Sequence, residues 1–311
     1  MLFYERMELD FIRRLRERLP QHEALLVGPG DDAAIVDLRG RGDVVVTTDM
    51  LTEGVDFILE ECGATRVGRK ALAVNLSDLA AMAAVPRAVV VSVALPREGA
   101  MQIGCELYEG LLPLAEDFET AVAGGDTNTW DGPLVVSITA LGTLTDRGPF
   151  LRSGARPGDA IVVTGDFGGS LLGKHFDFTP RVREALVLRE RYDVHAAIDV
   201  SDGLTLDLSR LCTESRCGAE LQLAQVPISA AARQAATTEP ASGRTALDRA
   251  LSDGEDFELV LTMPEAEARR LVNEQPFATP VTIVGRIVAE PGLWVVDADG
   301  LRPMVPQGFQ H

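Results

Sequence analysis

The sequence has few cysteines and little positive charge, and each shortage excludes a class of protein. Its 311 residues include Cys62, Cys105, Cys212 and Cys217, with no C-x2-C pair among them, and four histidines. This excludes a disulfide-stapled miniprotein and disfavours a structural zinc site, so we expect free thiols in a reducing compartment. Lys and Arg number 29 against 47 Asp and Glu, which gives a net charge of -18. Nucleic acid and anionic membrane surfaces should therefore be repelled, whereas acidic substrates are not excluded, because bound cations invert the local sign.

Long hydrophobic runs are also missing. The most apolar region, 79–96, is interrupted by Pro86 and Arg87, so it falls short of the roughly 20 apolar residues that a membrane helix needs. Residues 1–19 have the pattern of a charged amphipathic helix rather than a signal peptide, and we expect a cytoplasmic protein. The composition, 46% hydrophobic and 24% charged, is that of a globular protein. Its length favours about two domains.

Helical and strand-like patterns alternate along both halves of the chain. The turn-forming segment LRSGARPGDA, at 151–160, separates the halves, and we expect domains at 1–148 and 149–311. The alternation predicts an α/β or α+β fold but does not settle the order of the strands. We expect strands at 42–49, 87–96, 120–126, 134–144, 161–166, 195–203, 219–228, 258–263, 281–288 and 292–300, and further helices at 64–84, 101–118, 204–215 and 264–275.

The placement of aspartate is the most informative feature of the chain. Five motifs put carboxylates at the ends of apolar strands, in glycine turns or on a helix face of small residues, where solvated acids are uncommon. Any one of them can be explained as a helix cap or a turn. Together they predict an oxygen-only site for Mg2+, completed by the hydroxyls of Thr47, Thr48 and Ser201. The motifs are Gly30-Asp31-Asp32, Thr47-Thr48-Asp49, Asn75-x-x-Asp78, Gly124-Gly125-Asp126-Thr127 and Asp199-x-Ser201-Asp202-Gly203.

Other motifs have weaker implications. Residues 168–174, GGSLLGK, match the first seven positions of a phosphate-binding P-loop, but His175 stands where a magnesium-binding Ser or Thr is required. A glycine-rich turn that opens a helix is the better interpretation. Arg152 is either a phosphate ligand or a solvated linker residue. Lys70 either steadies the acidic site or is a surface lysine of its helix.

Seven segments in order, GDDAAIV, TTDMLTEGVDF, GRKALAVNLSDLAAMAA, GGDT, LRSGARPGD, IDVSDGL and GEDFEL, resemble the motifs of the thiamine-monophosphate kinase family. This family belongs to a superfamily that includes aminoimidazole ribonucleotide synthetase. The resemblance runs from about residue 28 to about residue 285. It implies an N-terminal α/β domain that dimerises through its sheet, a C-terminal α/β domain and an ATP site between them.

The resemblance also implies roles for individual residues. The reaction passes the γ-phosphoryl group of ATP to the phosphate of thiamine monophosphate. That phosphate is already ionised near neutral pH, so we assign no catalytic side chain. ATP contacts would be Tyr108, Gly125, Asp126, Arg152 and Ser201, and substrate contacts Asp56, Glu255 and Phe309. Several Mg2+ ions would be held by Asp32, Thr47, Thr48, Asp49, Asp78, Asp126, Asp199 and Asp202.

The sequence departs from the family pattern in three places. Asp56 stands where the family usually has His, Asp253-Gly254 replaces Gly-Gly, and the stretch between Gly169 and Asp199 is short. Two alternatives therefore stay open: an ATP-dependent relative with another acceptor, and a non-catalytic protein that binds divalent ions or a thiamine phosphate. The N-terminal glycine segment has no nearby Cys and the chain ends in His311, which disfavours selenophosphate and hydrogenase-maturation chemistry.

Overall fold

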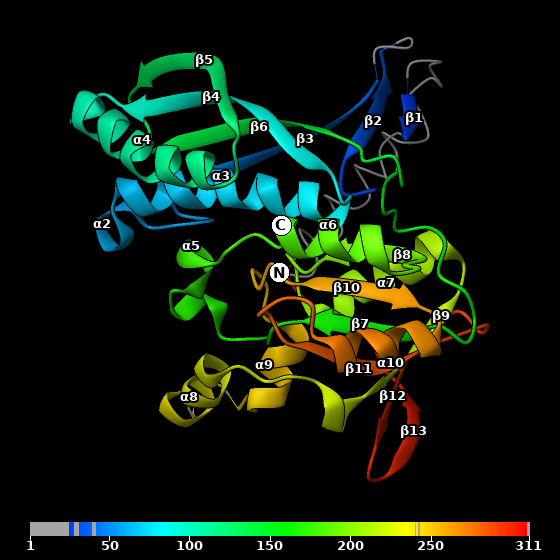
Figure 1. Cartoon of the computed structure of the whole chain (residues 1–311). Helices are drawn as coiled ribbons and strands as arrows, with labels where there is room; N and C mark the ends of the chain where they lie inside the picture. The colour runs from blue at the N-terminus through cyan, green and yellow to red at the C-terminus, as the bar shows by residue number, and fades with distance from the viewer. Residues whose placement is uncertain (1–24, 28–30, 39–41, 240, 242, 310–311) are drawn as a thin grey trace.

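The computed structural model describes residues 25–27, 31–38, 42–239, 241 and 243–309. The helix predicted for residues 1–19 lies outside this part of the chain. The described residues form two sheets with helices packed against them, which confirms the mixed α/β fold (Figure 1). The last strand of the first sheet ends at Thr143, and the next strand, which opens the second sheet, begins at Ala160. The domain boundary at residue 148 stays a prediction.

The first sheet has six strands in the order β1-β2-β3-β6-β4-β5. All neighbours are antiparallel except β4 and β5, which are parallel and need the long connection that α4 supplies. Helices α3 and α4 cover one face of this sheet (Figure 1). The strands are β1 (Leu25–Val27), β2 (Ala34–Asp37), β3 (Asp43–Thr52), β4 (Val85–Pro96), β5 (Ala121–Trp130) and β6 (Val135–Thr143), and the helices are α2 (Leu59–Cys62), α3 (Ala64–Ala81) and α4 (Ala100–Asp117).

The second sheet has seven strands in the order β13-β12-β9-β11-β7-β10-β8, and only β9 and β12 are parallel. Alternate residues of β7 enter different cores. Ala160 and Val162 pack toward the first domain, and Ile161 and Val163 pack toward α7. The strands are β7 (Ala160–Thr164), β8 (Ala196–Asp199), β9 (Gly218–Gln222), β10 (Leu259–Met263), β11 (Val281–Val288), β12 (Gly292–Asp297) and β13 (Gly300–Pro303). The helices are α5 (Lys174–Asp177), α6 (Val182–Arg191), α7 (Leu204–Ser215), α8 (Ala230–Thr238), α9 (Ala246–Ser252) and α10 (Glu265–Glu274), with 3-10 turns at Ser170–Leu172 and Leu223–Gln225.

Helix α3 lies between the two sheets and joins them. One side packs on β3 and β6, and the other contacts α5, α6 and β8 of the second half (Figure 1). Fourteen of its 18 residues are buried, including the polar residues Lys70, Asn75 and Ser77. A helix that is buried on all sides must be rich in small and apolar residues, as this one is. The side chains of Lys70 and Ser77 lie at the contact between the two halves of the molecule, since they bond to Glu255 and Asp199.

Two glycines allow α3 and α4 to approach each other closely. A Cβ atom on Gly68 would lie 1.9 Å from the carbonyl oxygen of Leu107, and one on Gly110 would lie 1.8 Å from the carbonyl oxygen of Thr65. Each helix therefore places a glycine against the backbone of the other. The contact fixes how α3 is seated on the sheet.

Most of the predicted elements are present, with exceptions that have local causes. The strand predicted for 219–228 ends at Gln222, because the chain turns at Leu223–Gln225 before Pro227. Cys217 follows α7 rather than lying on it. Helices α6, α8 and α9 were not predicted. All four cysteines are free, as expected. In the described part of the chain, no helix is long and apolar enough to cross a bilayer.

We predict that Gly68→Ala destabilises the fold by about 1–3 kcal/mol, because the added methyl group forces two backbones apart. The matched control is Gly104→Ala in α4, where the Cβ atom would meet only the side chain of Leu95 at 3.5 Å. The control should keep or raise the stability, since Ala is favoured over Gly in a helix by roughly 0.5–1 kcal/mol. Thermal unfolding measures both. Equal effects of the two substitutions would contradict the proposed packing constraint.

Candidate active site

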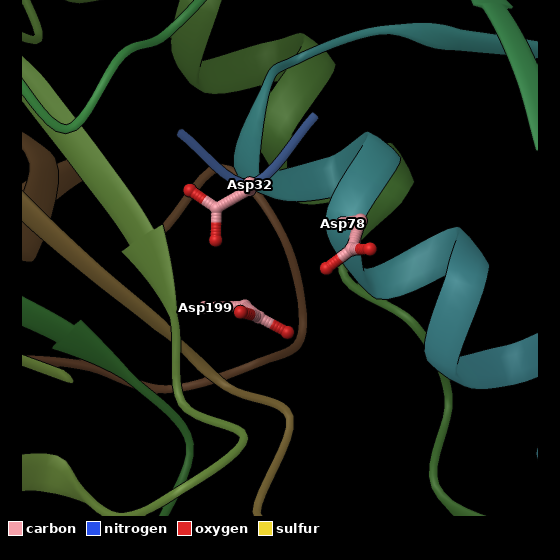
Figure 2. Close-up of side chains that lie close together, drawn as sticks. All are labelled: Asp32, Asp78 and Asp199. Carbon is pink, nitrogen blue, oxygen red and sulfur yellow. The ribbon is translucent and has the colours of Figure 1, made fainter. Parts of the chain in front are cut away.

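Three aspartates from different parts of the chain meet at the contact between the two halves. Carboxylate oxygens of Asp32, Asp78 and Asp199 all lie within 4.8 Å of one another (Figure 2). Asp32 precedes β2, Asp78 lies on α3, and Asp199 ends β8. All three were predicted as metal ligands from their motifs. We call them the aspartate cluster.

Two hydroxyl groups orient the aspartate cluster. Ser77 Oγ donates a hydrogen bond of 2.6 Å to Asp199 Oδ2, which links α3 to β8. Thr47 Oγ1, on β3, donates to Asp78 Oδ2. Both hydroxyl groups are buried, so these bonds are shielded from water. The sequence predicted Thr47 at the site but not Ser77.

Burial and mutual repulsion dominate the electrostatics of the cluster. Burial, followed by the charges of Asp49, Asp199 and Asp32, raises the pKa of Asp78 well above its ordinary value. Burial and the charge of Asp32 likewise raise the pKa of Asp199. Burial raises the pKa of Asp49 to about 6, with a further contribution from Asp56. A cation bound among these groups would remove the repulsion, and a donor set made only of oxygen atoms suits a hard divalent ion.

Two arginines supply part of the missing positive charge. The guanidinium group of Arg152 donates two hydrogen bonds to the carboxylate of Asp32, of 3.0 Å from Nε and 2.9 Å from Nη2. Its backbone N–H donates to both carboxylate oxygens of Asp31 at 3.1 Å. Arg152 is therefore bonded to the site rather than solvated. Arg210 Nη1 donates to Asp202 and, at 2.7 Å, to Asp207. The sequence did not point to Arg210.

A cavity of about 350 Å³ opens beside the cluster. Along α3 it runs from Asp78 past Val74 toward Lys70, whose ammonium group contacts Glu255 and the carbonyl oxygen of Asp56. We call the part near Asp56 and Glu255 the acceptor end. The predicted site residues that line the cavity are Asp49, Asp56, Asp78, Asp199, Ser201, Asp202, Glu255 and Phe309.

Burial rules out one of the two interpretations of Lys70. Its side chain is fully buried, so the interpretation as a surface lysine is wrong. In the described part of the chain, its ammonium group contacts Asp56, Glu255 and His175, none of which belongs to the aspartate cluster. Although burial alone would raise the pKa of Glu255, the hydrogen bond with His175 and the charge of Lys70 hold that pKa below its ordinary value. Glu255 is therefore a carboxylate at neutral pH.

Four predicted site residues belong neither to the cavity lining nor to the aspartate cluster and its hydrogen-bond partners. Thr48 points to the opposite side of β3 from Thr47, and its hydroxyl donates to the carbonyl oxygen of Ile138 at 3.1 Å. Gly125 and Asp126 lie on β5, at the exposed edge of the first sheet. Tyr108 is half-buried on α4 against the core. Their predicted contacts with ATP or metal stay predictions.

The backbone N–H groups of the P-loop-like turn at 168–174 are hydrogen-bonded to carboxylates of the protein itself. The backbone N–H of Gly168 donates to both oxygens of Asp256, at 3.0 and 2.9 Å, and that of Gly169 donates to Asp253 Oδ2 at 2.8 Å. Ser170 Oγ also donates to Asp256. The amide groups that would cradle a phosphate are thus already bonded. This explains structurally why the acidic segment 253–256 accompanies the glycine turn, and it supports the interpretation of that turn as local structure.

Three residues at the site were not predicted from the sequence, and they differ in how strong a sequence signal they carry. Ser77 adjoins Asp78 in a helix of small apolar residues, so its polarity was a usable signal. Arg210 lies three residues after Asp207, a spacing that places them on one helical face. His175 appeared only as the residue at which the P-loop pattern fails. Its contact with Glu255 joins positions far apart in sequence and has no local signal.

We predict that Asp78→Asn stabilises the metal-free protein at pH 8, because it removes one carboxylate from the aspartate cluster. The folded-state pKa of Asp78 is raised above the unfolded value of about 3.9, so the native state loses stability as the pH rises through this interval. Asn abolishes that loss, and we expect Tm to rise by about 2–6 °C at pH 8 and by much less at pH 4. Thermal unfolding in a chelator measures this. Asp131→Asn, at an exposed Asp131–Arg97 pair, is the control. A lower Tm for Asp78→Asn at pH 8 would contradict the repulsion.

The chain is similar to known proteins over most of its length. The models of the AIR synthase related protein family match the chain with their N-terminal domain at residues 30–144 and their C-terminal domain at residues 156–297. A thiamine-monophosphate kinase of Rhodopirellula baltica is 47% identical, over 98% of this chain and 97% of the relative.

Solved structures of thiamine-monophosphate kinases superpose on the chain. The structure described as AaThiL complexed with AMPPCP and TMP superposes with a TM-score of 0.81 at 27% identity, covering 98% of this chain and 96% of that one. A thiamine-monophosphate kinase from Stenotrophomonas maltophilia gives 0.73 at 34% identity, covering 92% and 95%. The chain therefore belongs to the thiamine-monophosphate kinase family of the AIR synthase related proteins.

Proposed function

We propose that the protein transfers the γ-phosphoryl group of ATP to the phosphate of thiamine monophosphate, giving thiamine diphosphate and ADP. The observation that carries the proposal is that one cavity has the aspartate cluster at one end and the separate acidic residues Asp56 and Glu255 at the other. The similarity to thiamine-monophosphate kinases over nearly the whole chain supports the choice of reaction. So does the solved relative that was complexed with AMPPCP and TMP.

The residues at the cluster fit Mg2+. The ligands would be Asp32, Asp78 and Asp199, with Asp49 and Asp202 nearby in the cavity wall and Thr47 holding Asp78. Bound Mg2+ would supply neutralisation of the negative charge on the two phosphate groups that react. Asp126 and Thr48 remain proposed ligands, and Tyr108, Gly125, Arg152 and Ser201 remain proposed ATP contacts.

The protein's own side chains orient the reactants rather than enter the reaction. Ser77 and Thr47 hold two carboxylates of the cluster in fixed directions, and Arg152 fixes a third. The acceptor phosphate is ionised near neutral pH and needs no base from the protein. We assign the organic part of the acceptor to Asp56, Glu255 and Phe309. A transfer of this kind is accelerated mainly by positioning and by charge compensation.

The test is an assay with purified protein, ATP, Mg2+ and thiamine monophosphate, in which thiamine diphosphate is quantified by chromatography. We expect product only when metal is present. A protein that binds ATP but forms no thiamine diphosphate would move the assignment to a relative with another acceptor. A protein that binds metal and thiamine monophosphate but turns over no ATP would support the non-catalytic alternative.

In the same assay, Asp32→Asn and Asp199→Asn should each lower turnover by about 100-fold or more, because each removes charge where phosphate oxygens must be neutralised. Both variants should remain folded, since Asn keeps the shape of the side chain. Asp131→Asn is the matched control and should retain full turnover, because Asp131 is exposed and pairs with the surface residue Arg97. Unchanged turnover in both cluster variants would refute the assigned roles.

We also propose a cytoplasmic homodimer. Four free cysteines fit a reducing compartment. One face of the first sheet has exposed apolar side chains, among them Val90 at 38%, and β5 leaves an exposed sheet edge. Light scattering should give twice the chain mass of 33.4 kDa. A monomer at micromolar concentration would contradict the dimer.

A further inference from the structure

Lys70 is a fully buried cation with partners in three separate segments. Its ammonium group donates to the carbonyl oxygen of Asp56 at 2.9 Å and lies 2.6 and 2.8 Å from the two carboxylate oxygens of Glu255. It also lies 3.0 Å from Nδ1 of His175. A buried ammonium group is tolerated only when it is paired and hydrogen-bonded. Here it joins α3 of the first domain to two segments of the second.

His175 completes the arrangement from the other side. Its ring is buried on α5, and Nδ1 lies 2.7 Å from Glu255 Oε2. Hydrogen bonds also join the α5 segment to α3, since Arg69 of α3 donates to the carbonyl oxygens of Phe176 at 2.9 Å and Phe178 at 2.7 Å. The imidazole therefore has little freedom to move away from Glu255.

Glu255 itself is held at its backbone as well as at its carboxylate. Its φ angle of +63° lies in the left-handed region, which is strained for a residue with a side chain. Its backbone N–H donates to the carbonyl oxygen of Ser201 at 2.6 Å. A carboxylate offers about four acceptor positions. Lys70 and His175 account for three contacts, which leaves capacity for a donor in the cavity.

We propose that Lys70 and His175 are positioning residues, which fix the carboxylate of Glu255 at the acceptor end so that it binds the cationic or N–H-bearing organic part of the acceptor. The inference rests on the proposed function. It assigns a role in substrate selection to Lys70 of the first domain and His175 of the second. Neither residue lines the cavity, so each acts through Glu255. The chemistry selected is that of a positively charged or amine-bearing aromatic ring.

The first test is steady-state kinetics of His175→Leu. Loss of the imidazole frees the Glu255 carboxylate, and we expect KM for thiamine monophosphate to rise about 10-fold, with KM for ATP and kcat within about twofold. His175→Gln, which keeps a hydrogen-bond donor, should recover part of the loss. The matched control is Arg66→Met, because Arg66 also ties α3 to the α5 segment through Asp177 but does not contact Glu255. An unchanged acceptor KM in His175→Leu would overturn the proposal.

The second test does not depend on activity. Lys70→Met leaves the Glu255 carboxylate without its cation and should lower Tm strongly, whereas the double variant Lys70→Met, Glu255→Gln should recover much of the loss. Additive effects of the two single substitutions on stability would overturn the pairing. The two proposals fail differently. A wild-type protein that forms no thiamine diphosphate refutes the function, while coupling between Lys70 and Glu255 in thermal unfolding can still be measured.

Discussion

The repulsion among Asp32, Asp78 and Asp199 is the constraint on which the site depends. Like charges a few ångströms apart in a buried position disfavour folding unless protons or cations intervene. The chain compensates only in part: Arg152 pairs with Asp32, whereas the carboxylates of Asp78 and Asp199 receive only hydroxyl donors from the residues that the structure describes. Their raised pKa values follow from this shortage. Protons relieve the remaining repulsion where the pKa values are raised, and a bound cation would relieve it without protonation.

In the second domain, the buried carboxylate of Glu258 has its negative charge compensated by an arginine. Glu258 is almost fully buried, yet it receives two 2.6 Å hydrogen bonds from Arg181 and one of 2.8 Å from Thr164. Glu258 therefore stabilises local structure and needs no ligand. Asp256 is intermediate: its pKa is raised to about 7 by burial, although hydrogen bonds from Ser170 and Gly168 act to lower it. Glu258 and the aspartate cluster are all buried, so burial does not distinguish them. What distinguishes them is that Glu258 has a paired cation, whereas Asp78 and Asp199 are hydrogen-bonded to hydroxyl groups.

Sequence patterns predicted the site better than they predicted the sheets. The aspartates were visible because a carboxylate on a helix as apolar as α3 has no ordinary explanation. Thr47 and Thr48 could have been separated, since successive residues of a strand face opposite sides. Strand order could not be predicted, because β6 pairs between β3 and β4 rather than next to β5. The contacts of Lys70 were also hidden: its partners His175 and Glu255 lie 105 and 185 positions away, and only tertiary packing brings them together.

Helix α3 explains why the two ends of the cavity keep a fixed separation. Lys70, Val74 and Ser77 follow the i, i+4, i+7 spacing of one helical face, and all three face the second domain or the cavity. Two turns of helix separate Lys70 from Ser77, about 10 Å at ~1.5 Å per residue. One end of this stripe holds Glu255, and the other holds Asp199 beside Asp78. Because both anchors belong to one buried helix, a change in the packing of α3 would move the acceptor end and the aspartate cluster together. An acceptor of fixed length would then bind with its phosphate and its ring system at constant spacing.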